Sequence, residues 1–416
     1  MELYGKFLEA PKLRFNYSSA SAIDSLPKRG LYKYGPYDSA LLGKEEIKCI
    51  VLFPAEKTVE KQIFIEGLTK GEGTFRGFQH LFRLSLRFIA EIPFKSQEEF
   101  DRVLDQIHSE NPDIVYIILN DRDSNIYNQA KLKLLANGIP SQMIKSEKIS
   151  EASGRQYILE NISLATYAKI GGTPWTISTM NNDNNLILGV SRAMDHQGKY
   201  LVGFVVLFTN DGDYLFMNSS TPVIDWNQYV EGLSKSVEKA IYEYKSNIGV
   251  PTSIIVHFHK RPEKKEIEAI ENALRNTIQD IPYALVHINE YSNFKLFDSS
   301  HPSYIPPKGL CVNLTLHEAL LLLDGRLEDK RHKAGVPTVL NVRIDKRSTL
   351  TPDYFPYIFK QIYDFSFVNW RGFNAAAIPI TLNYSKLIAR MVINIGISNW
   401  NQIIASGRLR DKGWFL

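Results

Sequence analysis

The sequence predicts an α/β protein built as two successive lobes. In the first lobe, which ends at about residue 170, buried strands alternate with helices, the pattern of a parallel sheet with helical crossovers. From Leu186 three strands follow one another before helices and strands alternate again. The chain has 416 residues, of which 44% are hydrophobic and 23% charged, so its composition indicates a folded chain and argues against disorder or a coiled coil.

The elements of the first lobe follow from hydrophobic periodicity. A lead-in over residues 1–40 is rich in Gly, Pro, Ser and Tyr and is predicted to be irregular. Strands are expected at residues 47–53, 113–119 and 142–144, and helices at residues 59–68, 97–109, 125–137 and 159–169. Between residues 70 and 88, basic residues are interleaved with phenylalanines, a pattern that fits either a nucleic-acid-binding face or a helix with one apolar and one basic side.

The second lobe opens with an antiparallel meander. Strands are expected at residues 186–192, 200–209 and 213–218, and the last two are joined by Asn-Asp-Gly, a strong hairpin signal. A helix at 225–245, a strand at 252–258, a helix at 262–278 and a strand at 283–289 follow. Further strands (311–322 and 336–344) and helices (352–366 and 384–394) complete the chain. This is the element order of the ribonuclease H-like fold, which by itself gives no function.

Charge and cysteine content narrow the class of protein only slightly. The chain has 49 Lys and Arg against 45 Asp and Glu, so any basic surface must be local. Cys49 and Cys311 lie far apart and supply neither a disulfide framework nor a cysteine-based metal site, which favours a reducing compartment. Because the first residues lack the apolar core of a signal peptide and no apolar run could span a membrane, we expect a cytoplasmic protein without direct membrane insertion.

Four polar residues in the first lobe have a spacing that suits a phosphate site. Tyr127 and Lys131 are four residues apart on a predicted helix and therefore share one face. Gln142 follows a proline turn at the start of a strand, and Lys169 lies in the last turn of the next helix. A phosphate with a base stacked above it needs an aromatic ring and several convergent donors. For each residue alone, a solvated lysine or a packed tyrosine is the ordinary alternative, and the spacing does not decide between them.

These four residues belong to a longer series of motifs that resembles a known family. Together with Ile-Gly-Gly-Thr-Pro-Trp at 170–175, they resemble the 5′-phosphate pocket of Argonaute MID domains and the entry to the PIWI domain. Arg-Gly-Leu-Tyr-Lys-Tyr-Gly-Pro-Tyr-Asp at 29–38 resembles the segment that precedes MID in prokaryotic Argonautes. Val-Asn-Trp-Arg-Gly-Phe at 368–373 and the terminal Trp-Phe-Leu at 414–416 resemble the end of PIWI.

The resemblance covers nearly the whole chain, but an N-terminal half with N and PAZ domains is missing from it. It is therefore a resemblance to the short MID–PIWI Argonautes of archaea and bacteria. It implies a lead-in segment at residues 1–40, a Rossmann-like MID domain at 41–170 that binds the 5′ end of a guide, and a ribonuclease H-like PIWI domain at 171–416.

The resemblance also implies roles for particular residues toward a small guide RNA or DNA. Tyr127 would stack on the first guide base, while Lys131, Gln142 and Lys169 would hold the 5′ phosphate. The terminal carboxylate of Leu416 would reach the same phosphate through Mg²⁺, because a hard cation is needed to bridge two oxygen anions. Arg371 is a further candidate for contact with the guide backbone. The terminal Trp-Phe-Leu could equally be an apolar tail docked on the core, and both roles can hold together.

The residues expected to cut a target are replaced. Argonautes that cut resemble ribonuclease H enzymes in holding two Mg²⁺ ions with a set of carboxylates. Ser191, His259 and Asn383 stand where this set is expected, so we expect an inactive PIWI domain with no catalytic residue. The alternative is a guide-directed nuclease with non-standard ligands, such as Asp183 or Asp195 after a shift of register. His257 and His259 also share a strand face and would need a third ligand to bind a metal.

An inactive guide-binding protein must act through other molecules. The resemblance implies recognition of a complementary target strand by base pairing, together with separately encoded partner proteins that include an effector. It thereby implies a role in defence against viruses or plasmids. Exposed strand edges in the second lobe leave homodimerisation open. A nucleotide-binding or structural protein that shares only the fold is a further alternative, and the type of guide and target is not specified by the sequence.

Overall fold

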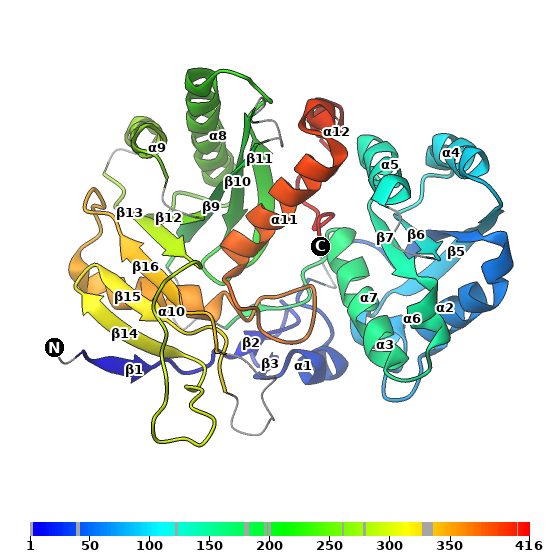
Figure 1. Cartoon of the computed structure of the whole chain (residues 1–416), viewed down its shortest axis with the longest axis horizontal. Helices are drawn as coiled ribbons and strands as arrows, with labels where there is room; N and C mark the ends of the chain where they lie inside the picture. The colour runs from blue at the N-terminus through cyan, green and yellow to red at the C-terminus, as the bar shows by residue number, and fades with distance from the viewer. Residues whose placement is uncertain are drawn as a thin grey trace. The chain divides into compact units, whose positions relative to one another are not determined.

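The computed structural model describes residues 3–38, 42–120, 124–178, 183–194, 198, 201–259, 262–277, 280–326, 336–405 and 407–416. The chain folds into two compact units (Figure 1). The large-sheet unit consists of Met1–Lys12, Ile177–Asn369 and Asn374–Arg390, and the parallel-sheet unit of Leu13–Thr176, Trp370–Phe373 and Met391–Leu416. The domain limits predicted from the sequence stay predictions, because a compact unit need not coincide with a family domain.

The parallel-sheet unit is built on four parallel strands in the order β5-β4-β6-β7. The strands are β4 (Glu46–Pro54), β5 (Ser85–Phe94), β6 (Ile114–Leu119) and β7 (Ser141–Lys145). The helices α2 (Thr58–Lys70), α4 (Gln97–Gln106), α5 (Ser124–Ala136), α6 (Ser146–Ser150) and α7 (Arg155–Lys169) connect or follow them. Every residue of β6 is buried, as expected for a strand covered on both faces. The predicted strands at 47–53, 113–119 and 142–144 are confirmed, and the sheet has the Rossmann-like form that was expected.

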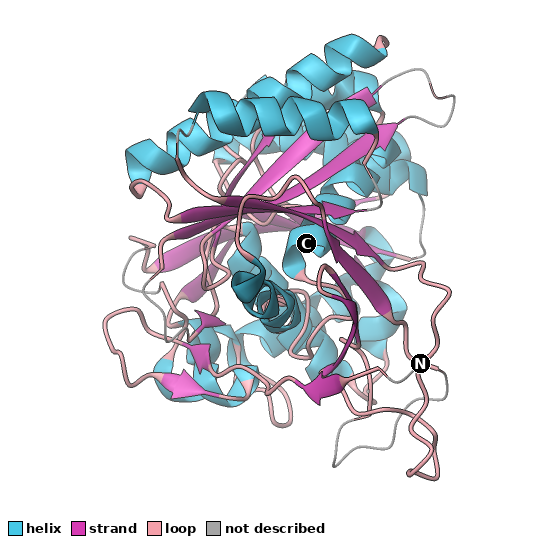
Figure 2. Ribbon diagram, turned by 90° about the vertical axis from the view of Figure 1, so that its left-hand side faces the viewer, coloured by secondary structure: helices cyan, strands magenta, loops and turns pink. Residues whose placement is uncertain are grey.

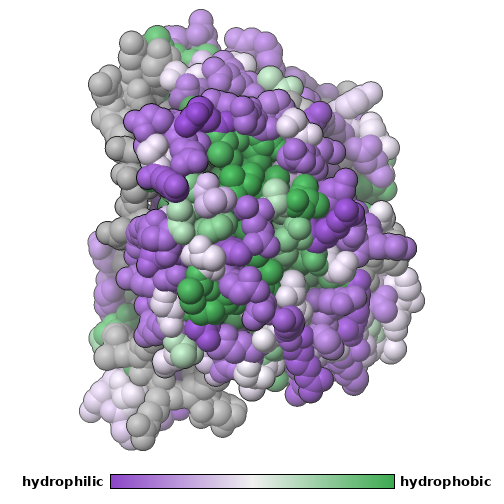
Figure 3. All heavy atoms as spheres, turned by 90° about the vertical axis from the view of Figure 1, so that its right-hand side faces the viewer, coloured by the Kyte–Doolittle hydropathy of each residue, from purple (hydrophilic) through white to green (hydrophobic). Residues whose placement is uncertain are grey.

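The stretch rich in basic and aromatic residues is not one amphipathic helix. It contains only the short helix α3 (Phe78–Phe82) and then β5, a strand that the sequence analysis did not predict. Phe75, Phe78 and Phe82 are buried, so their rings belong to the core and are not available for base stacking. The strand β5 forms one edge of its sheet, and its apolar residues stay partly exposed. Figure 3 views the side on which Figure 1 draws β5 and α4, and shows apolar patches within a largely hydrophilic surface.

The lead-in is more ordered than the sequence suggested. It pairs β2 (Leu13–Arg14) with β3 (Ile23–Asp24) and forms the helix α1 (Pro27–Tyr34). A side chain at Gly30 would collide with the Phe15 ring, since an ideal Cβ would lie 2.1 Å from that ring. Asp38 accepts a hydrogen bond of 2.7 Å from the hydroxyl of Tyr167 on α7. The Gly-Leu…Gly-Pro-Tyr-Asp motif therefore packs this segment against the helix that ends in Lys169.

The large-sheet unit contains a nine-stranded sheet in the order β1-β14-β15-β16-β13-β12-β9-β10-β11. Its strands are β1 (Gly5–Phe7), β9 (Asn185–Met194), β10 (Leu201–Phe208), β11 (Tyr214–Ser219), β12 (Ser253–His259), β13 (Tyr283–Asn289), β14 (Leu310–Thr315), β15 (Glu318–Leu321) and β16 (Leu340–Ile344). The strands β9, β10 and β11 form the predicted antiparallel meander, and β9, β12 and β13 run parallel. The predicted ribonuclease H-like element order is confirmed.

Helices cover both faces of this sheet (Figure 2). On one face, α8 (Trp226–Asn247) and α9 (Lys264–Thr277) enclose an apolar core with Leu188 and Val190 of β9. The residue between those two, Gly189, faces the opposite side, where a Cβ would lie 2.4 Å from the carbonyl oxygen of Thr381. Thr381 lies in the first turn of α11 (Ile380–Ile395), so this helix packs against β9 with no room for a side chain at Gly189.

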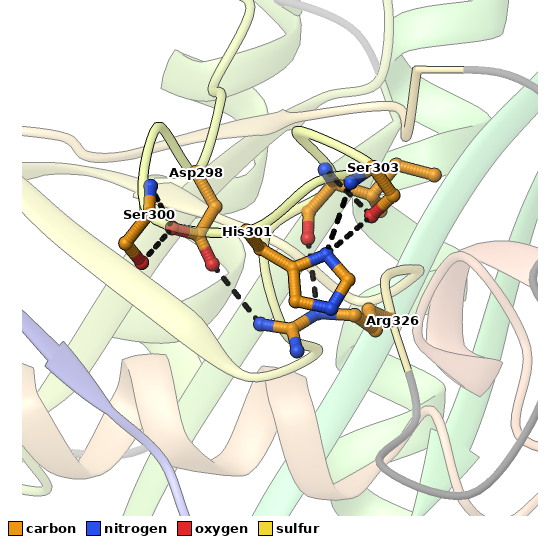
Figure 4. A network of polar contacts seen from close by, with 6 residues as sticks. Asp298, Ser300, His301, Ser303 and Arg326 are labelled. Atoms are coloured by element: carbon orange, nitrogen blue, oxygen red, sulfur yellow. Dashed lines mark hydrogen bonds and ion pairs between the residues drawn. The ribbon is translucent and has the colours of Figure 1, made fainter.

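The region between β13 and β14 has no regular elements but is held by polar contacts (Figure 4). Asp298 accepts hydrogen bonds from the backbone and hydroxyl of Ser300, and it pairs with Arg326 at 3.0 Å. The Nδ1 atom of His301 lies 2.8 Å from the hydroxyl of Ser303. The predicted strand at 311–322 is two strands, because β14 turns back into β15.

The described part of the chain contains neither a membrane-spanning helix nor a disulfide. None of its helices combines the length and the apolar character needed to cross a bilayer. Cys49 and Cys311 are both buried and unpaired, as the sequence analysis expected for a chain without a disulfide framework.

Candidate functional site

A cavity of about 390 Å³ lies in the parallel-sheet unit at the end of β7. It is bounded by β7, by the helices α6 and α7, and by two segments from the far end of the sequence that contribute Arg371 and Leu416. The residues that line it are Gln142, Met143, Ile144, Lys145, Lys148, Ile158, Asn161, Ile162, Ala165, Arg371 and Leu416. Three of these are cations, so the cavity combines an apolar wall with a basic rim.

Two lysines meet at one backbone carbonyl beside this cavity. The ammonium groups of Lys131 on α5 and Lys169 on α7 donate to the carbonyl oxygen of Ser141 at 2.7 and 2.9 Å. Lys169 also donates to the Gln142 side-chain oxygen at 2.6 Å, and Gln142 lines the cavity. Each lysine is only 2% exposed. The structure therefore brings three of the four predicted phosphate-binding residues into one hydrogen-bonded cluster.

Burial changes the ionisation of both lysines. It lowers the pKa of Lys131 from 10.5 to about 7. It also lowers the pKa of Lys169 well below its ordinary value, and the charges of Lys131 and Arg371 add to that effect. No carboxylate acts on either group, so neither lysine has an anionic partner among the described residues. Because an adjacent anion favours the charged form of a lysine, this cluster is suited to receive one.

Tyr127 lies beside Lys131 but does not line the cavity. Its ring centre is 5.7 Å from the Lys131 ammonium, a cation–π distance, and its hydroxyl lies 4.0 Å from the Met391 sulfur. The ring is half-buried, so one part of it stays open to solvent. The position one turn before Lys131 on α5, predicted from the sequence, is confirmed, whereas its role as a stacking platform stays a prediction.

The end of the chain reaches the cavity while its aromatic residues are buried. Trp414 packs its ring 5.9 Å from that of Trp400, and Phe415 is buried beside it. The backbone of Gly413 donates to the carbonyl of Ala168 at 3.0 Å, next to Lys169. Leu416 remains half-buried and lines the cavity. The aromatic part of the tail is therefore docked on the core, as one of the two alternatives proposed, while the role of the Leu416 carboxylate toward a guide phosphate stays a prediction.

Arg371 reaches the same cavity from a short segment held by aromatic packing. The indole nitrogen of Trp370 donates to the carbonyl of Trp175 at 3.2 Å, and Phe373 stacks with the Trp175 ring at 6.1 Å. These contacts hold the residues on either side of Arg371 and Gly372, and Arg371 itself is exposed and lines the cavity.

Several residues of this site were missed from the sequence. Lys145 and Lys148 lie on the basic rim, and Asn161 of α7 faces the cavity. The spacing of Lys145 and Lys148 at the beginning of α6 was a usable signal for the rim. The carbonyl of Ser141, on which both buried lysines converge, has no signal in a sequence, because every residue carries a carbonyl group.

A second group of predicted residues gathers in the large-sheet unit. The parallel strands β9 and β12 pair Val190 with Phe258, and each is followed by one of the predicted positions, Ser191 and His259. The Ser191 hydroxyl donates to the carbonyl of Ser385 on α11 at 3.2 Å. Asn383 lies half-buried on the same helix. The three positions expected for metal ligands therefore come from adjoining strands and the helix against them.

The charges at this centre come from two residues that the sequence analysis did not single out. Glu290 directly follows β13. Its Oε1 atom lies 3.1 Å from Nε2 of His259 and also pairs with the ammonium group of Lys386 on α11. Glu290 had no signal beyond its place after a strand. Lys386 lies three residues after Asn383 and so shares its side of α11. One lysine cation and one carboxylate thus occupy this centre.

The structure offers no alternative metal centre among the residues it describes. The described ranges contain no group of three or more His, Cys, Asp or Glu that could hold an ion. His257 is buried, its Nδ1 is 2.9 Å from the Thr381 hydroxyl, and burial lowers its pKa to about 3, so it is neutral. Asp183 is exposed before β9, and Asp195 lies outside the described residues.

These features define a protein with a Rossmann-like unit and a ribonuclease H-like unit. The Piwi domain family matches residues 114–395, which is more than half of the chain. The chain therefore belongs to the Argonaute/Piwi family, with MID-like and PIWI-like parts in its 416 residues.

The relatives include long and short proteins. The chain is 24% identical to the argonaute protein of Cereibacter sphaeroides, and the match covers 98% of this chain and 58% of that protein. It is 25% identical to the Piwi protein of Archaeoglobus fulgidus, with 93% of each covered. A Clostridium butyricum Argonaute bound to a guide DNA and a target DNA has a similar fold, with a TM-score of 0.75, 18% identity and coverage of 96% of this chain and 54% of that one. Drosophila Piwi gives a TM-score of 0.74 at 14% identity, covering 99% of this chain and 56% of that one.

Proposed function

We propose that this protein anchors the 5′-phosphorylated end of a small guide RNA or DNA and presents the guide for pairing with a target, without cutting the target. The observation that carries this proposal is the pair of buried lysines that share one carbonyl oxygen and have no carboxylate partner in the described chain. Two buried ammonium groups are costly without an anion, and a terminal phosphate supplies one with several acceptor oxygens.

Binding of the phosphate would exchange existing contacts. The Lys169 ammonium would leave the Gln142 oxygen for a phosphate oxygen, and the freed Gln142 amide would point into the cavity. The Lys131 ammonium, which lies beside the Tyr127 ring, would likewise exchange the Ser141 carbonyl for a phosphate oxygen. Tyr127 would then stack on the first base, which is worth about 1–3 kcal/mol per base in other proteins. Arg371 is suited to contact the guide backbone at the wall of the cavity.

The residues at this cavity fit a bound Mg²⁺ ion. Leu416, which would carry a terminal carboxylate, and Asn161, whose side chain has an amide oxygen, both line this cavity, and Mg²⁺ prefers oxygen ligands of these kinds. A bound cation would supply positive charge between the carboxylate and the guide phosphate. The chain's own contribution is the Gly413–Ala168 hydrogen bond, which holds the tail beside Lys169.

The proposal that the protein does not cut rests on the charges at Ser191, His259 and Asn383. The first and third are uncharged, and Glu290, the carboxylate that the described residues place beside His259, is already paired with Lys386. Two close divalent cations need several anionic ligands, which this centre lacks.

The wider role is proposed from the family. The Clostridium butyricum relative is bound to guide and target DNA, which supports pairing of a guide with a target as the mode of recognition. An inactive guide-binding protein needs partner proteins to act, so we propose that effector partners in the cytoplasm complete a defence against viruses or plasmids. The chain spans 58% of the length of the Cereibacter protein.

Nucleic acid that copurifies with the protein from its native cells tests this function. We expect a narrow length class of short strands with 5′ phosphates, and we expect the Lys131→Ala/Lys169→Ala variant to lose them. Lys70→Ala is the matched control, because Lys70 lies in the same unit but is exposed and paired with Glu66. Absence of such strands, together with failure to retain synthetic 5′-phosphorylated guides, would contradict the proposal.

A further inference from the structure

A second cavity lies in the large-sheet unit, beside α9. Its volume is about 460 Å³, and it is bounded by β13, β15, β16 and the beginning of α9, which Figure 1 draws next to one another. The residues that line it are Pro262, Lys264, Ile267, His287, Asn289, Glu318, Asn341, Arg343, Asp345 and Arg347. All of them belong to the large-sheet unit, and none of them lines the cavity of the proposed guide site. A cavity of this volume can hold a small molecule.

The register of three neighbouring strands explains why polar side chains gather at this cavity. Leu285 of β13 belongs to the apolar core that α8 and α9 cover, so His287 and Asn289, at alternate positions, lie on the same face of the sheet. Arg343 of β16 is paired in register with His287 on one side and with Glu318 of β15 on the other. The sheet therefore places an imidazole, a guanidinium and a carboxylate in one row.

The cavity contains an arginine whose charge is not neutralised by an ion pair. The Asp345 carboxylate is already engaged, because its Oδ2 lies 3.2 Å from Nε2 of His287 and its Oδ1 lies 3.7 Å from Nε of Arg347. Arg343 is exposed and forms no ion pair among the described residues. Its guanidinium therefore keeps a planar fork of donors available for an anionic ligand.

A second cation can reach the same space from the helix. Lys264 is the first residue of α9, and its side chain is 81% exposed. It pairs with Glu268 one turn further along at 3.6 Å, a surface ion pair of a kind that contributes little free energy. The Lys264 ammonium can therefore turn toward a ligand at small cost.

Neutral donors and an acceptor complete the lining. The side-chain oxygen of Asn289 accepts from the backbone of Tyr291 at 3.0 Å, which leaves its amide nitrogen as a donor. Asn341 donates to the Glu318 carboxylate at 2.9 Å, and that carboxylate has further acceptor sites. The cavity thus combines cations with a group that can accept hydrogen bonds from hydroxyls.

We propose that this cavity binds a phosphorylated small molecule that carries hydroxyl groups, the chemistry that nucleotides and sugar phosphates share. The Arg343 guanidinium would bind the phosphate together with the Lys264 ammonium, because a guanidinium fork matches two phosphate oxygens. The Glu318 carboxylate would accept hydrogen bonds from the hydroxyl groups, and the Asn289 amide would donate to them. This site goes beyond the proposed guide site and does not depend on it.

The test uses the full-length Lys131→Ala/Lys169→Ala variant, which lacks the lysines of the other candidate phosphate site. Ribose 5-phosphate and adenosine 5′-monophosphate are titrated into it by calorimetry, and unphosphorylated ribose serves as the comparison. We expect both phosphates to bind at a single site and ribose not to bind. Tighter binding of the adenosine compound would identify the ligand as a nucleotide, and equal binding would identify it as a sugar phosphate. Unaltered protein saturated with a 5′-phosphorylated guide should give the same result.

Further substitutions assign the binding to this cavity. Arg343→Met should weaken binding of both phosphates about ten- to hundredfold, the range expected for hydrogen bonds to a charged group, and Arg343→Lys should keep part of the affinity. Glu318→Gln should weaken binding of ribose 5-phosphate but not of inorganic phosphate, because only the former has hydroxyl groups to donate. Arg275→Met is the matched control, since Arg275 is an exposed arginine of α9 that pairs with Glu271 and does not line the cavity.

The outcomes separate this inference from the proposed function. Failure of both phosphates to bind, or an equal effect of Arg343→Met and Arg275→Met on their binding, would overturn the inference. If the phosphates bind in this cavity while the unaltered protein fails to bind a 5′-phosphorylated guide, the proposed function is wrong and the inference stands.

Discussion

The two buried lysines beside the cavity are energetically unfavourable for folding, and this cost points to a functional role. Lys131 and Lys169 are nearly inaccessible and share the Ser141 carbonyl. A fold selected for stability alone would gain by replacing either with an apolar side chain, because burial of an unpaired charge costs free energy. An anion that joined the two lysines would offset this cost, and this is why we propose that they bind a phosphate.

Stability should depend on pH through Lys131. Its pKa is lowered from 10.5 to about 7 in the folded protein, so between these values the unfolded chain binds more protons. The free energy of unfolding should therefore increase as pH rises from about 7 to 10.5, and the penalty should be fully present below pH 7, with a total of a few kcal/mol. Denaturant unfolding of the guide-free protein measures this. Lys131→Met should weaken the dependence, while the part contributed by Lys169, whose pKa is also lowered by burial, should remain. An unchanged pH profile in that variant would contradict the assignment.

Guide binding should take up protons near pH 8. A 5′ phosphate would favour the charged forms of Lys131 and Lys169, whose pKa values are lowered by burial. Calorimetric titration with a 5′-phosphorylated guide, in buffers of different ionisation enthalpy, gives the number of protons bound. We expect positive uptake, and a smaller value for a 5′-hydroxyl guide. Equal values for the two guides would show that the lysines do not respond to the phosphate.

Removing Lys169 should weaken binding selectively. Lys169→Ala should cost about 1.5–3 kcal/mol of binding free energy for a 5′-phosphorylated guide, the range for hydrogen bonds to charged groups. It should have little effect on a 5′-hydroxyl guide. Equilibrium binding of both guides, with Lys70→Ala as the control, measures the difference. An equal loss for both guides would indicate a general folding defect.

At the scale of single residues, the sequence predicted which side chains lie together but not the hydrogen bonds and ion pairs that hold them in place. Tyr127, Lys131, Gln142 and Lys169 have a recognisable spacing. The shared carbonyl of Ser141 and the Glu290–Lys386 pair depend on tertiary contacts between distant segments, and no local pattern encodes such contacts. The roles of the first four residues toward a guide remain predictions.

At the scale of elements, strands and helices with strong periodicity were predicted correctly, such as β4, β6 and α8. The strand β5 was missed because its apolar residues are only half-buried at a sheet edge, and its basic residues resemble those of an amphipathic helix. The helix α1 was missed because Pro and Gly usually indicate a turn, whereas here Pro27 begins the helix and Gly30 makes room for Phe15. In both cases tertiary packing determined the element more than local preference did.

The contact of α11 with β9 predicts a position intolerant of any side chain. Gly189→Ala would place a Cβ 2.4 Å from the backbone oxygen of Thr381, which cannot move without displacing the helix. We expect a loss of about 1–3 kcal/mol in the free energy of unfolding, measured with urea. Gly203→Ala in the same sheet approaches only side chains, at 3.2 Å from Leu233, and should cost less. A Gly189→Ala protein as stable as Gly203→Ala would contradict this packing.

At the scale of the whole molecule, the compact units do not follow the linear order of the chain. Residues 370–373 and 391–416 belong to the parallel-sheet unit, although the segment between them belongs to the large-sheet unit. Sequence analysis found the terminal motifs but could not assign them to a unit, because hydrophobic patterns report burial and not the partner. This return of the chain places Arg371 and Leu416 at the cavity beside Gln142.

The loaded protein should bind a complementary target and leave it intact. Among the described residues, the centre at Ser191, His259 and Asn383 has no group of three or more possible ligands to hold metal ions, so on the proposed function adding Mg²⁺ or Mn²⁺ should produce no cleavage. Incubation of guide-loaded protein with end-labelled target, followed by denaturing electrophoresis, measures this. Discrete products at one position would favour the alternative of a guide-directed nuclease with non-standard ligands.

The most direct test of the account is the affinity of the protein for two guides that differ only at the 5′ end. Equilibrium dissociation constants would be measured for one sequence with a 5′ phosphate and with a 5′ hydroxyl. The account predicts that the phosphate form binds about tenfold tighter or more, corresponding to about 1.4 kcal/mol, and that the difference disappears in the Lys131→Ala/Lys169→Ala variant. Equal affinity for the two guides would contradict the central claim that the buried lysines form a 5′-phosphate site.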